Sequence, residues 1–207
     1  NPVAQAAKDA GVEIVGDIEL LVRARPEARY IGITGTNGKS TTTDLIGHIL
    51  ETVGMPTAVG GNLGLPALSL DALGSSGVYV LEMSSYQLEL TPSVQFDVAI
   101  LLTISPDHLD RHGGMDGYIA AKRRIFEQQS AGSTAIIGID DADAKGLFDR
   151  LIADREQGVV PISSEITVDG GVYASGPILI DATGGTAEMV RSLDGIETLP
   201  GGHNAQN

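Results

Sequence analysis

The chain has 207 residues, of which 42% are hydrophobic and 19% are charged, and this is long enough to bury one sizeable core. Asp and Glu number 27 against 13 Lys and Arg, so the formal net charge is -14. A charge of this sign argues against nucleic acid or an anionic membrane as a partner. With no cysteine, and no apolar run of the ~18 residues that span a bilayer, the composition predicts a cytoplasmic protein.

The segment before Pro26 holds short apolar stretches, and we interpret residues 1–26 as the tail and linker of a preceding α/β unit. Residue 1 is Asn rather than Met, and residues 201–207 have the pattern of a helix that is just starting. We therefore expect the chain to be an excerpt of a longer protein, with residues 27–207 as its one sizeable domain.

From residue 30 to about 160, apolar strand-like runs alternate with helical patterns. This alternation is the sequence form of a mostly parallel sheet flanked by helices, so it predicts an α/β fold. The predicted strands are residues 30–34, 57–59, 78–83, 98–102, 134–139 and 159–162.

Two helices have clear signals. The first begins at Lys39–Thr41 and stops at Gly54, because glycine commonly ends a helix. Its predicted buried stripe is Leu45, Ile46, Ile49, Leu50 and Val53. The second helix spans residues 116–129. Residues 166–180 then change to short β-rich pieces separated by glycines, which predicts a small antiparallel appendage.

A glycine-rich loop joins the first predicted strand to the first helix. Residues 34–41 read Thr-Gly-Thr-Asn-Gly-Lys-Ser-Thr, and in this setting backbone N–H groups converge on a phosphate beside the positive end of a helix. Lys39 adds a formal charge, and Ser40 is placed to offer its hydroxyl to Mg²⁺. The loop is a variant, because the general P-loop pattern has glycine where this chain has Ile33. The candidate nucleotide-binding residues are Gly35, Thr36, Asn37, Gly38, Lys39, Ser40 and Thr41.

Polar side chains follow the strand at 78–83. Glu82 lies at its carboxyl end, the edge where ligands bind in open α/β sheets, so it can share Mg²⁺ with Ser40. Ser84 and Gln87 offer neutral hydrogen-bonding groups beside it. The alternative for Glu82 is a carboxylate that only caps the next helix.

A second polar cluster follows the strand at 98–102, and its titratable groups make His108 a candidate metal ligand or substrate contact. The spacing of Lys122 alone indicates no more than a solvated helix lysine. A phosphate loop does not by itself choose among kinase, hydrolase and ligase, since all three bind the triphosphate in the same way.

Several segments together resemble the Mur ligase superfamily. The loop at 34–41 is similar to the ATP loop of that superfamily, departure at Ile33 included. Residues that resemble its D-glutamate-adding members lie at 60–64, 82–89, 107–111, 118–122 and 199–204. The resemblance extends over essentially the whole chain, and it implies a P-loop NTPase-like central domain that binds ATP.

The resemblance implies two Mg²⁺ sites. Lys39 and the loop amides would hold the β- and γ-phosphates, and Ser40 with Glu82 would hold one Mg²⁺. His108 and Lys122 would hold the second, with CO2 converting Lys122 to a carbamate that offers oxygen ligands. The implied catalytic residues are therefore Lys39, Glu82, His108 and Lys122.

The resemblance also implies substrates and a reaction. ATP would phosphorylate the carboxylate of UDP-N-acetylmuramoyl-L-alanine, and the amine of D-glutamate would attack the acyl phosphate to form an amide in peptidoglycan synthesis. The implied muramoyl-alanine contacts are Asn62, Ser84, Gln87 and His108, and the implied adenine contacts are Asn204 and Asn207. The UDP-binding domain would be represented only by residues 1–26 and the amino-acid-binding C-terminal domain would be absent, so we expect a monomeric excerpt that is inactive alone.

Two alternatives remain open from the sequence. Another ligase of the superfamily, including the folylpolyglutamate type, would share the loop at 34–41 but not the segment 82–87. A P-loop hydrolase or nucleotide-sensing switch would instead turn over ATP whether or not an acceptor amine is present.

Overall fold

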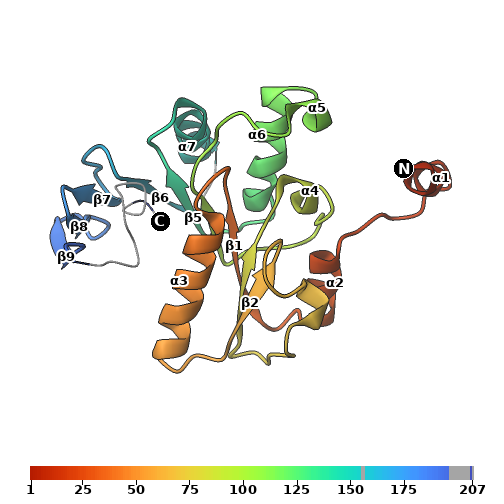
Figure 1. Cartoon of the computed structure of the whole chain (residues 1–207), viewed down its shortest axis with the longest axis horizontal. Coiled ribbons are helices and arrows are strands. Elements are labelled where there is room, and N and C mark those ends of the chain that lie inside the picture. The colour runs from red at the N-terminus through yellow and green to blue at the C-terminus, as the bar shows by residue number, and fades with distance from the viewer. Residues whose placement is uncertain (155–156, 196–205, 207) are drawn as a thin grey trace.

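The computed structural model describes residues 1–154, 157–195 and 206. Its strands form one nine-stranded sheet in the order β2-β3-β1-β4-β5-β6-β7-β8-β9 (Figure 1). The strands that run parallel through the middle are β1 (Arg29–Thr34), β2 (Thr57–Gly61), β3 (Val78–Glu82), β4 (Val98–Leu101), β5 (Thr134–Gly138) and β6 (Gly158–Ser163). The predicted α/β class and the six predicted strands are confirmed.

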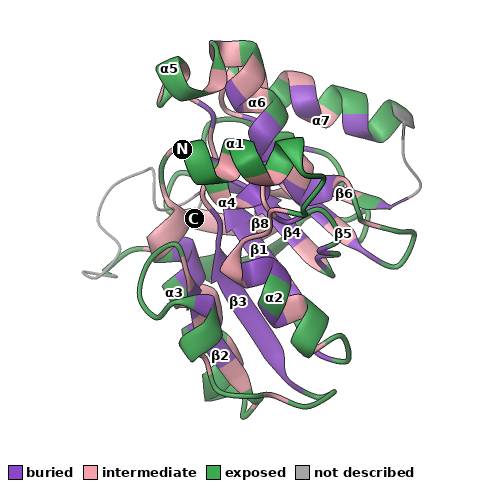
Figure 2. Cartoon of the chain, turned by 90° about the vertical axis from the view of Figure 1, so that its right-hand side faces the viewer, coloured by how far each residue is buried: buried purple, intermediate pink, exposed green. Residues whose placement is uncertain are grey.

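Helices cover both faces of this sheet. They are α2 (Asp17–Ala24), α3 (Lys39–Thr52), α4 (Ser85–Leu88), α5 (Leu109–His112), α6 (Met115–Arg123) and α7 (Ala142–Asp154), with 3-10 turns at Ala67–Ser69 and Arg124–Phe126. Parallel strands buried on both faces are apolar throughout, and every residue of β3 is buried (Figure 2). Tyr79 and Leu81 point to the larger core cluster, while Val78 and Val80 point to the cluster beneath α3.

The registers of β1, β3 and β4 bring the carboxyl ends of these three strands side by side. Ile33 of β1 lies opposite Glu82 of β3 on one side and opposite Ile100 of β4 on the other. The loops that leave these parallel strands therefore emerge together at one edge of the sheet.

The predicted apolar stripe of α3 is partly wrong. Ile49 and Val53 are 52% and 67% exposed. The helix approaches the sheet at Gly47, where an added Cβ would lie 2.4 Å from the Cγ2 of Val59. This close approach favours small residues over a stripe of large ones, and it leaves Ile49 and Val53 on the outer face.

The helix predicted at 116–129 is shorter in the structure. Regular helix ends at Arg123, and the chain continues as the 3-10 turn Arg124–Phe126. Ile125 and Phe126 are both buried in this turn. Burial of these two apolar side chains favours the tighter 3-10 turn over further regular helix.

The predicted antiparallel appendage is confirmed, but it continues the main sheet. Its strands are β7 (Val172–Ser175), β8 (Ile178–Asp181) and β9 (Glu188–Ser192). β7 pairs parallel with the end of β6, and β8 and β9 then add antiparallel neighbours.

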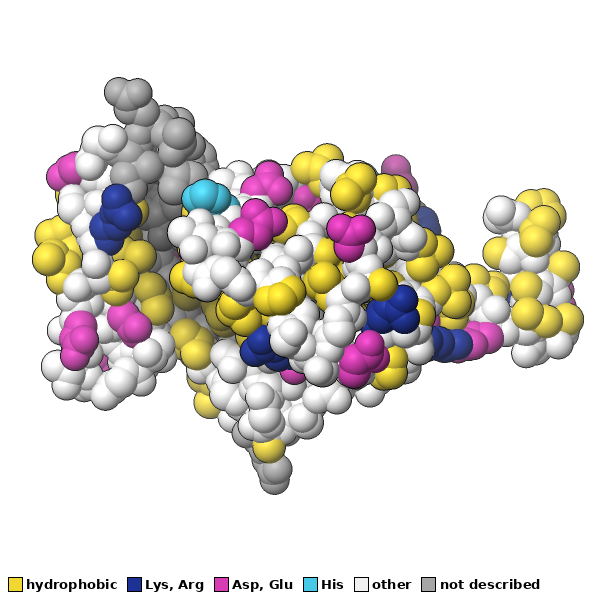
Figure 3. All heavy atoms as spheres, turned by 90° about the horizontal axis from the view of Figure 1, so that it is seen from below, with side chains coloured by type: hydrophobic (Ala, Val, Ile, Leu, Met, Phe, Trp, Pro, Cys, Tyr) yellow, Lys and Arg dark blue, Asp and Glu magenta, His cyan; other side chains and the backbone are white. Residues whose placement is uncertain are grey.

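The N-terminal segment contains two different helices. α1 (Pro2–Asp9) buries none of its residues and projects away from the sheet, as Figure 3 also shows. In α2, by contrast, Ile18 is fully buried in the core, and the buried carboxylate of Glu19 accepts a hydrogen bond from the backbone N–H of Ser93. Among the described helices, none is long and apolar enough to cross a membrane.

Candidate nucleotide-binding site

The loop between β1 and α3 curls at two glycines. Gly35 has φ 149° and Gly38 has φ 84°, so the positive dihedrals that the turn requires fall on residues without a Cβ. Gly38 is the N-cap of α3, and no side chain of the described residues caps this helix. The first N–H groups of α3 are therefore left for an anion at the positive end of a fourteen-residue helix.

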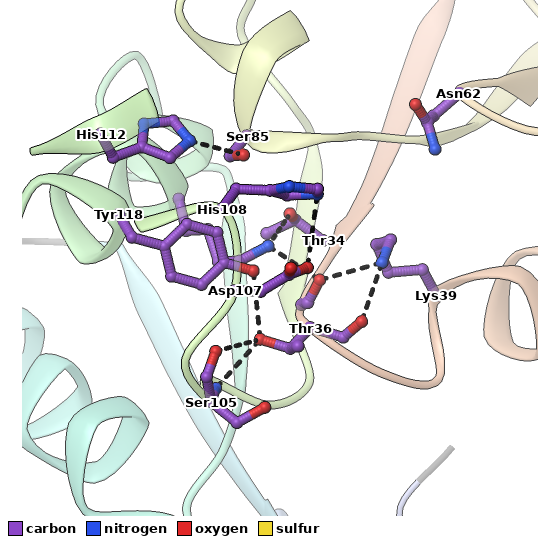
Figure 4. Close-up of polar contacts among 12 residues, drawn as sticks. Thr34, Thr36, Lys39, Asn62, Ser85, Ser105, Asp107, His108, His112 and Tyr118 are labelled. Atoms are coloured by element: carbon purple, nitrogen blue, oxygen red, sulfur yellow. Dashed lines mark hydrogen bonds and ion pairs between the residues drawn. The ribbon is translucent and has the colours of Figure 1, made fainter. Parts of the chain in front are cut away.

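Lys39 folds back over the loop. Its Nζ donates to the carbonyl oxygens of Gly35, at 3.1 Å, and Thr36, at 3.0 Å (Figure 4). The ammonium is thus held against the backbone of the loop, where it can serve as the countercharge of a bound phosphate. Thr41, in the first turn of α3, is exposed.

Glu82, Ser40 and Asn62 form a small polar group at the ends of β3 and β2. The Ser40 hydroxyl donates to Glu82 Oε2 at 2.7 Å, and the Asn62 amide donates to Glu82 Oε1 at 2.9 Å. Glu82 is only 3% exposed. A carboxylate beside a hydroxyl is a set of hard oxygen donors of the kind that Mg²⁺ binds.

Thr36 connects the loop to the neighbouring segments, a role that the sequence did not reveal. Its Oγ1 donates to the Ser105 carbonyl at 3.1 Å, accepts from the Ser105 N–H at 3.0 Å and lies 3.1 Å from the Tyr118 hydroxyl. The adjacent N–H of Asn37 donates to Thr103 Oγ1 at 3.0 Å. The phosphate loop is therefore fixed against the segment after β4 and against α6.

Lys122 is buried behind the phosphate loop, with 2% of its surface exposed. Its Nζ donates to the carbonyl of Gly35 at 2.8 Å and lies 4.7 Å from the centre of the Tyr118 ring. Burial, helped by the charge of Lys39, lowers the pKa of Lys122 to about 7, while Asp107 opposes the shift. The description of Lys122 as a solvated helix lysine is therefore wrong, and spacing alone carried no signal of its burial.

His108 lies at the start of α5 with its side chain half-exposed. Its Nε2 is 3.4 Å from Asp107 Oδ2, and its ring lies 5.3 Å from the Tyr86 ring. The structure thus brings His108, Lys122 and the phosphate loop to the same sheet edge. No cluster of three or more His, Cys, Asp or Glu with metal-binding geometry occurs among the described residues.

Ser84 and Gln87 bond to each other. Ser84 Oγ accepts from the Gln87 N–H, and Gln87 Oε1 accepts from the Ser84 N–H, which makes a capping box at the start of α4. The Gln87 side-chain oxygen is therefore used locally, and its Nε2 is the donor that remains for a ligand.

A cavity of about 570 Å³ opens beside Asn37 and the segment after β4. The other residues that line it are Thr103, Ile104, Ser105, Asp140, Asp141, Ser164, Glu165 and Gln206. Sequence reasoning missed Asp140 and Asp141, although they follow β5 at the same sheet edge as Glu82. The predicted adenine contacts Asn204 and Asn207 lie outside the described residues.

A strand, phosphate loop and helix beside an acidic strand end define a nucleotide-binding α/β domain. The Mur ligase middle domain family matches residues 33–207, and the chain belongs to the Mur ligases. UDP-N-acetylmuramoylalanine–D-glutamate ligases from Rhodospirillum rubrum and Caulobacter vibrioides are 54% and 51% identical to it, over 100% and 98% of this chain. The chain spans 43% and 44% of the length of these two relatives.

Solved structures show the same fold at low sequence identity. MurF from Acinetobacter baumannii matches 91% of this chain and 42% of its own with a TM-score of 0.62 and 20% identity. The UDP-N-acetylmuramate:L-alanyl-gamma-D-glutamyl-meso-diaminopimelate ligase (MPL) from Neisseria meningitides matches 99% of this chain and 66% of its own, with a TM-score of 0.69 and 15% identity.

Proposed function

We propose that this chain supplies the ATP-binding centre of a ligase that joins D-glutamate to UDP-N-acetylmuramoyl-L-alanine through an acyl phosphate. The observation that carries the proposal is the meeting of the phosphate loop, the Ser40–Glu82 pair and the buried Lys122 at one sheet edge. The names of relatives that are about half identical support the choice of substrates.

In this proposal residues 27–207 form the ATP-binding domain, and residues 1–26 belong to the end of a UDP-binding unit. The amino-acid-binding domain lies in the remaining length that the relatives have. The ligase acts as a monomer in the cytoplasm, where ATP is available.

The β- and γ-phosphates of ATP bind the amides of the loop at 35–41, and Lys39 Nζ exchanges its two carbonyl partners for phosphate oxygens. The nucleoside occupies the cavity beside Asn37, with Asn204 and Asn207 near the adenine. Lys39 and the loop amides then stabilise charge as the γ-phosphoryl group moves to the substrate carboxylate.

Ser40 and Glu82 hold one Mg²⁺, and their oxygen donor set fits this ion, which commonly takes one or two protein ligands plus phosphates and water. Asn62 orients Glu82 from the other side. In this proposal the muramoyl-alanine substrate contacts Asn62, Ser84, Gln87 and His108. Bound Mg²⁺ supplies neutralisation of phosphoryl charge.

Lys122 and His108 hold the second Mg²⁺ after Lys122 reacts with CO2. A pKa of about 7 leaves much of the Lys122 amine neutral at neutral pH, and only the neutral amine attacks CO2. The amine nitrogen adds to the carbon of CO2 as one C–O π bond opens, one proton is released, and the neutral amine becomes a carbamate anion with oxygen ligands. Lys122 and Lys39 both donate to the Gly35 carbonyl. This position supports the role, because the positive charge of Lys39 would stabilise the negative charge of a carbamate on Lys122.

The full-length ligase tests the proposed reaction. We expect phosphate release from ATP to require both UDP-N-acetylmuramoyl-L-alanine and D-glutamate. Stimulation by a different acceptor would favour another ligase of the family, and turnover that ignores every acceptor amine would favour a hydrolase or switch.

A second experiment tests the carbamate. Lys122→Ala should remove most ligase activity, and bicarbonate or a short-chain carboxylic acid should restore part of it by supplying the missing oxygens. Full activity of Lys122→Ala would remove the carbamate from the proposal.

A further inference from the structure

α5 is a single helical turn that begins after His108 and ends at His112. His108 has φ 49°, and it is the one non-glycine residue with positive φ in the described part of the chain. Left-handed backbone is strained for a residue that carries a Cβ. A four-residue helix also gains too little from its own hydrogen bonds to persist alone. The conformation of His108 must therefore be held by contacts from outside the turn.

His112, the last residue of α5, makes such contacts with residues outside the turn. Its Nε2 lies 3.0 Å from Ser85 Oγ (Figure 4). Its side chain is 1% exposed, and Nδ1 lies 3.2 Å from Glu89 Oε1. His112 thus uses both ring nitrogens, Nε2 in a hydrogen bond with the Ser85 hydroxyl and Nδ1 in a close polar contact with the Glu89 carboxylate. Since Ser85 and Glu89 lie at the two ends of α4, His112 ties α5 to that helix.

The His112 ring also touches the residues that flank the reactive groups. Its centre lies 5.5 Å from Tyr86 and 5.5 Å from Tyr118. Tyr86 contacts the His108 ring at 5.3 Å, while the Tyr118 hydroxyl reaches Thr36 of the phosphate loop at 3.1 Å. His112 is thus in contact with both sides of the candidate site without lying in it.

We propose that His112 is a positioning residue that fixes the orientation of His108 relative to the phosphate loop. The inference rests on the proposed function, because the role of His108 is assigned there. The neighbouring Arg111 pairs with Glu89 at 2.7 Å, but its side chain is 55% exposed. Its guanidinium also lies 5.6 Å from the centre of the Tyr86 ring. Exposed contacts contribute little, so Arg111, which touches Glu89 and Tyr86 from the surface, provides the control.

A double-mutant cycle in the full-length ligase tests this role. His112→Phe keeps an aromatic ring between Tyr86 and Tyr118 but removes both polar contacts. We expect it to lower kcat about 10- to 100-fold, as loss of an orienting partner does, while KM for ATP changes little. In a His108→Ala background the same change should lower kcat by less than about twofold, because the residue it positions is gone. Arg111→Met should have little effect in either background.

An equal loss in both backgrounds would overturn the proposal, since it would show a general structural defect, and so would an unchanged kcat. If His112→Phe fails to fold, Ser85→Ala removes one contact only and should show the same non-additivity with a smaller loss.

Imidazole NMR of the full-length protein gives a readout without substrate. The His108 signal, assigned from His108→Ala, should shift or broaden in Ser85→Ala and stay unchanged in Arg111→Met. An unchanged signal in Ser85→Ala would contradict the positioning role. Absence of D-glutamate-dependent turnover in the unmodified enzyme would instead contradict the proposed function, and the NMR result would still decide the role of His112.

Discussion

The phosphate loop and the corner formed by α4, α5 and α6 meet at one sheet edge, but they are built differently. The loop is one continuous segment whose lysine bonds to carbonyls three and four residues away. The corner consists of helices of four, four and nine residues, joined by the side chains of His112, Ser85 and Tyr118. A local motif can thus specify a binding loop, whereas the groups around it depend on contacts distant in the sequence.

The largest expected effect is on catalysis, and it comes from a substitution in the phosphate loop. Lys39→Ala removes the formal charge held at the loop, so kcat of the full-length ligase should fall about 10²- to 10³-fold. The decrease is measured as D-glutamate-dependent phosphate release.

Lys145→Ala is the control, because Lys145 is a half-exposed lysine of α7 paired with Asp149 at 3.0 Å. It should leave turnover unchanged. Wild-type turnover in Lys39→Ala would mean that the loop does not hold the triphosphate.

Lys122 gives a second, pH-dependent effect, on stability. Its pKa is about 7 in the folded state, against ~10.4 in an unfolded chain. Below pH 7 both states bind the proton, and the fold carries the full cost of a buried cation. From pH 7 to ~10.4 only the unfolded state keeps the proton, so stability rises with pH, and above that range the cost is gone.

Lys122→Met lacks this cost, and the Gly35 carbonyl keeps Lys39 as a partner. In CO2-free buffer it should be more stable than wild type by a few kcal/mol near pH 6, with a gap that closes toward pH 10. Urea denaturation at several pH values measures the gap. Lys145→Met should show no such gap, and parallel curves for Lys122→Met and wild type would contradict the burial of a titrating amine.

The smallest expected effect is on stability, and it concerns the packing of α3 against β2. Gly47→Ala places a methyl group against Val59 and should destabilise the fold by about 1–3 kcal/mol. Gly146→Ala, in α7, is the matched control, because an added Cβ there meets nothing within 4 Å and alanine favours a helix by up to ~1 kcal/mol. Equal free energies of unfolding for the two variants would contradict the close packing of α3 on β2.

The sequence predicted the elements whose signals are local. Strands buried on both faces appear as apolar runs, and the loop at 34–41 is recognisable from its glycines and lysine. Glu82 could be singled out because it ends such a strand. The same rule applied to the strand at 134–139 would have identified Asp140 and Asp141 beside the cavity.

Other features depend on packing that no spacing reveals. Gly47 decides which face of α3 meets the sheet, so the predicted stripe failed at Ile49 and Val53. The burial of Lys122 depends on the loop folded over it. Ser84 and Gln87 do carry a local signal, since Ser followed three residues later by Gln is a capping-box pattern.

A crystal structure of the full-length ligase with a non-hydrolysable ATP analogue and Mg²⁺ tests the central claim most directly. We predict the β- and γ-phosphates against the amides of residues 35–41, with Lys39 Nζ turned from the Gly35 and Thr36 carbonyls to the phosphates. Mg²⁺ should lie between Ser40 and Glu82 in place of their hydrogen bond. Phosphates bound away from Lys39, or a Glu82 carboxylate that stays paired with Ser40 and takes no metal, would contradict it.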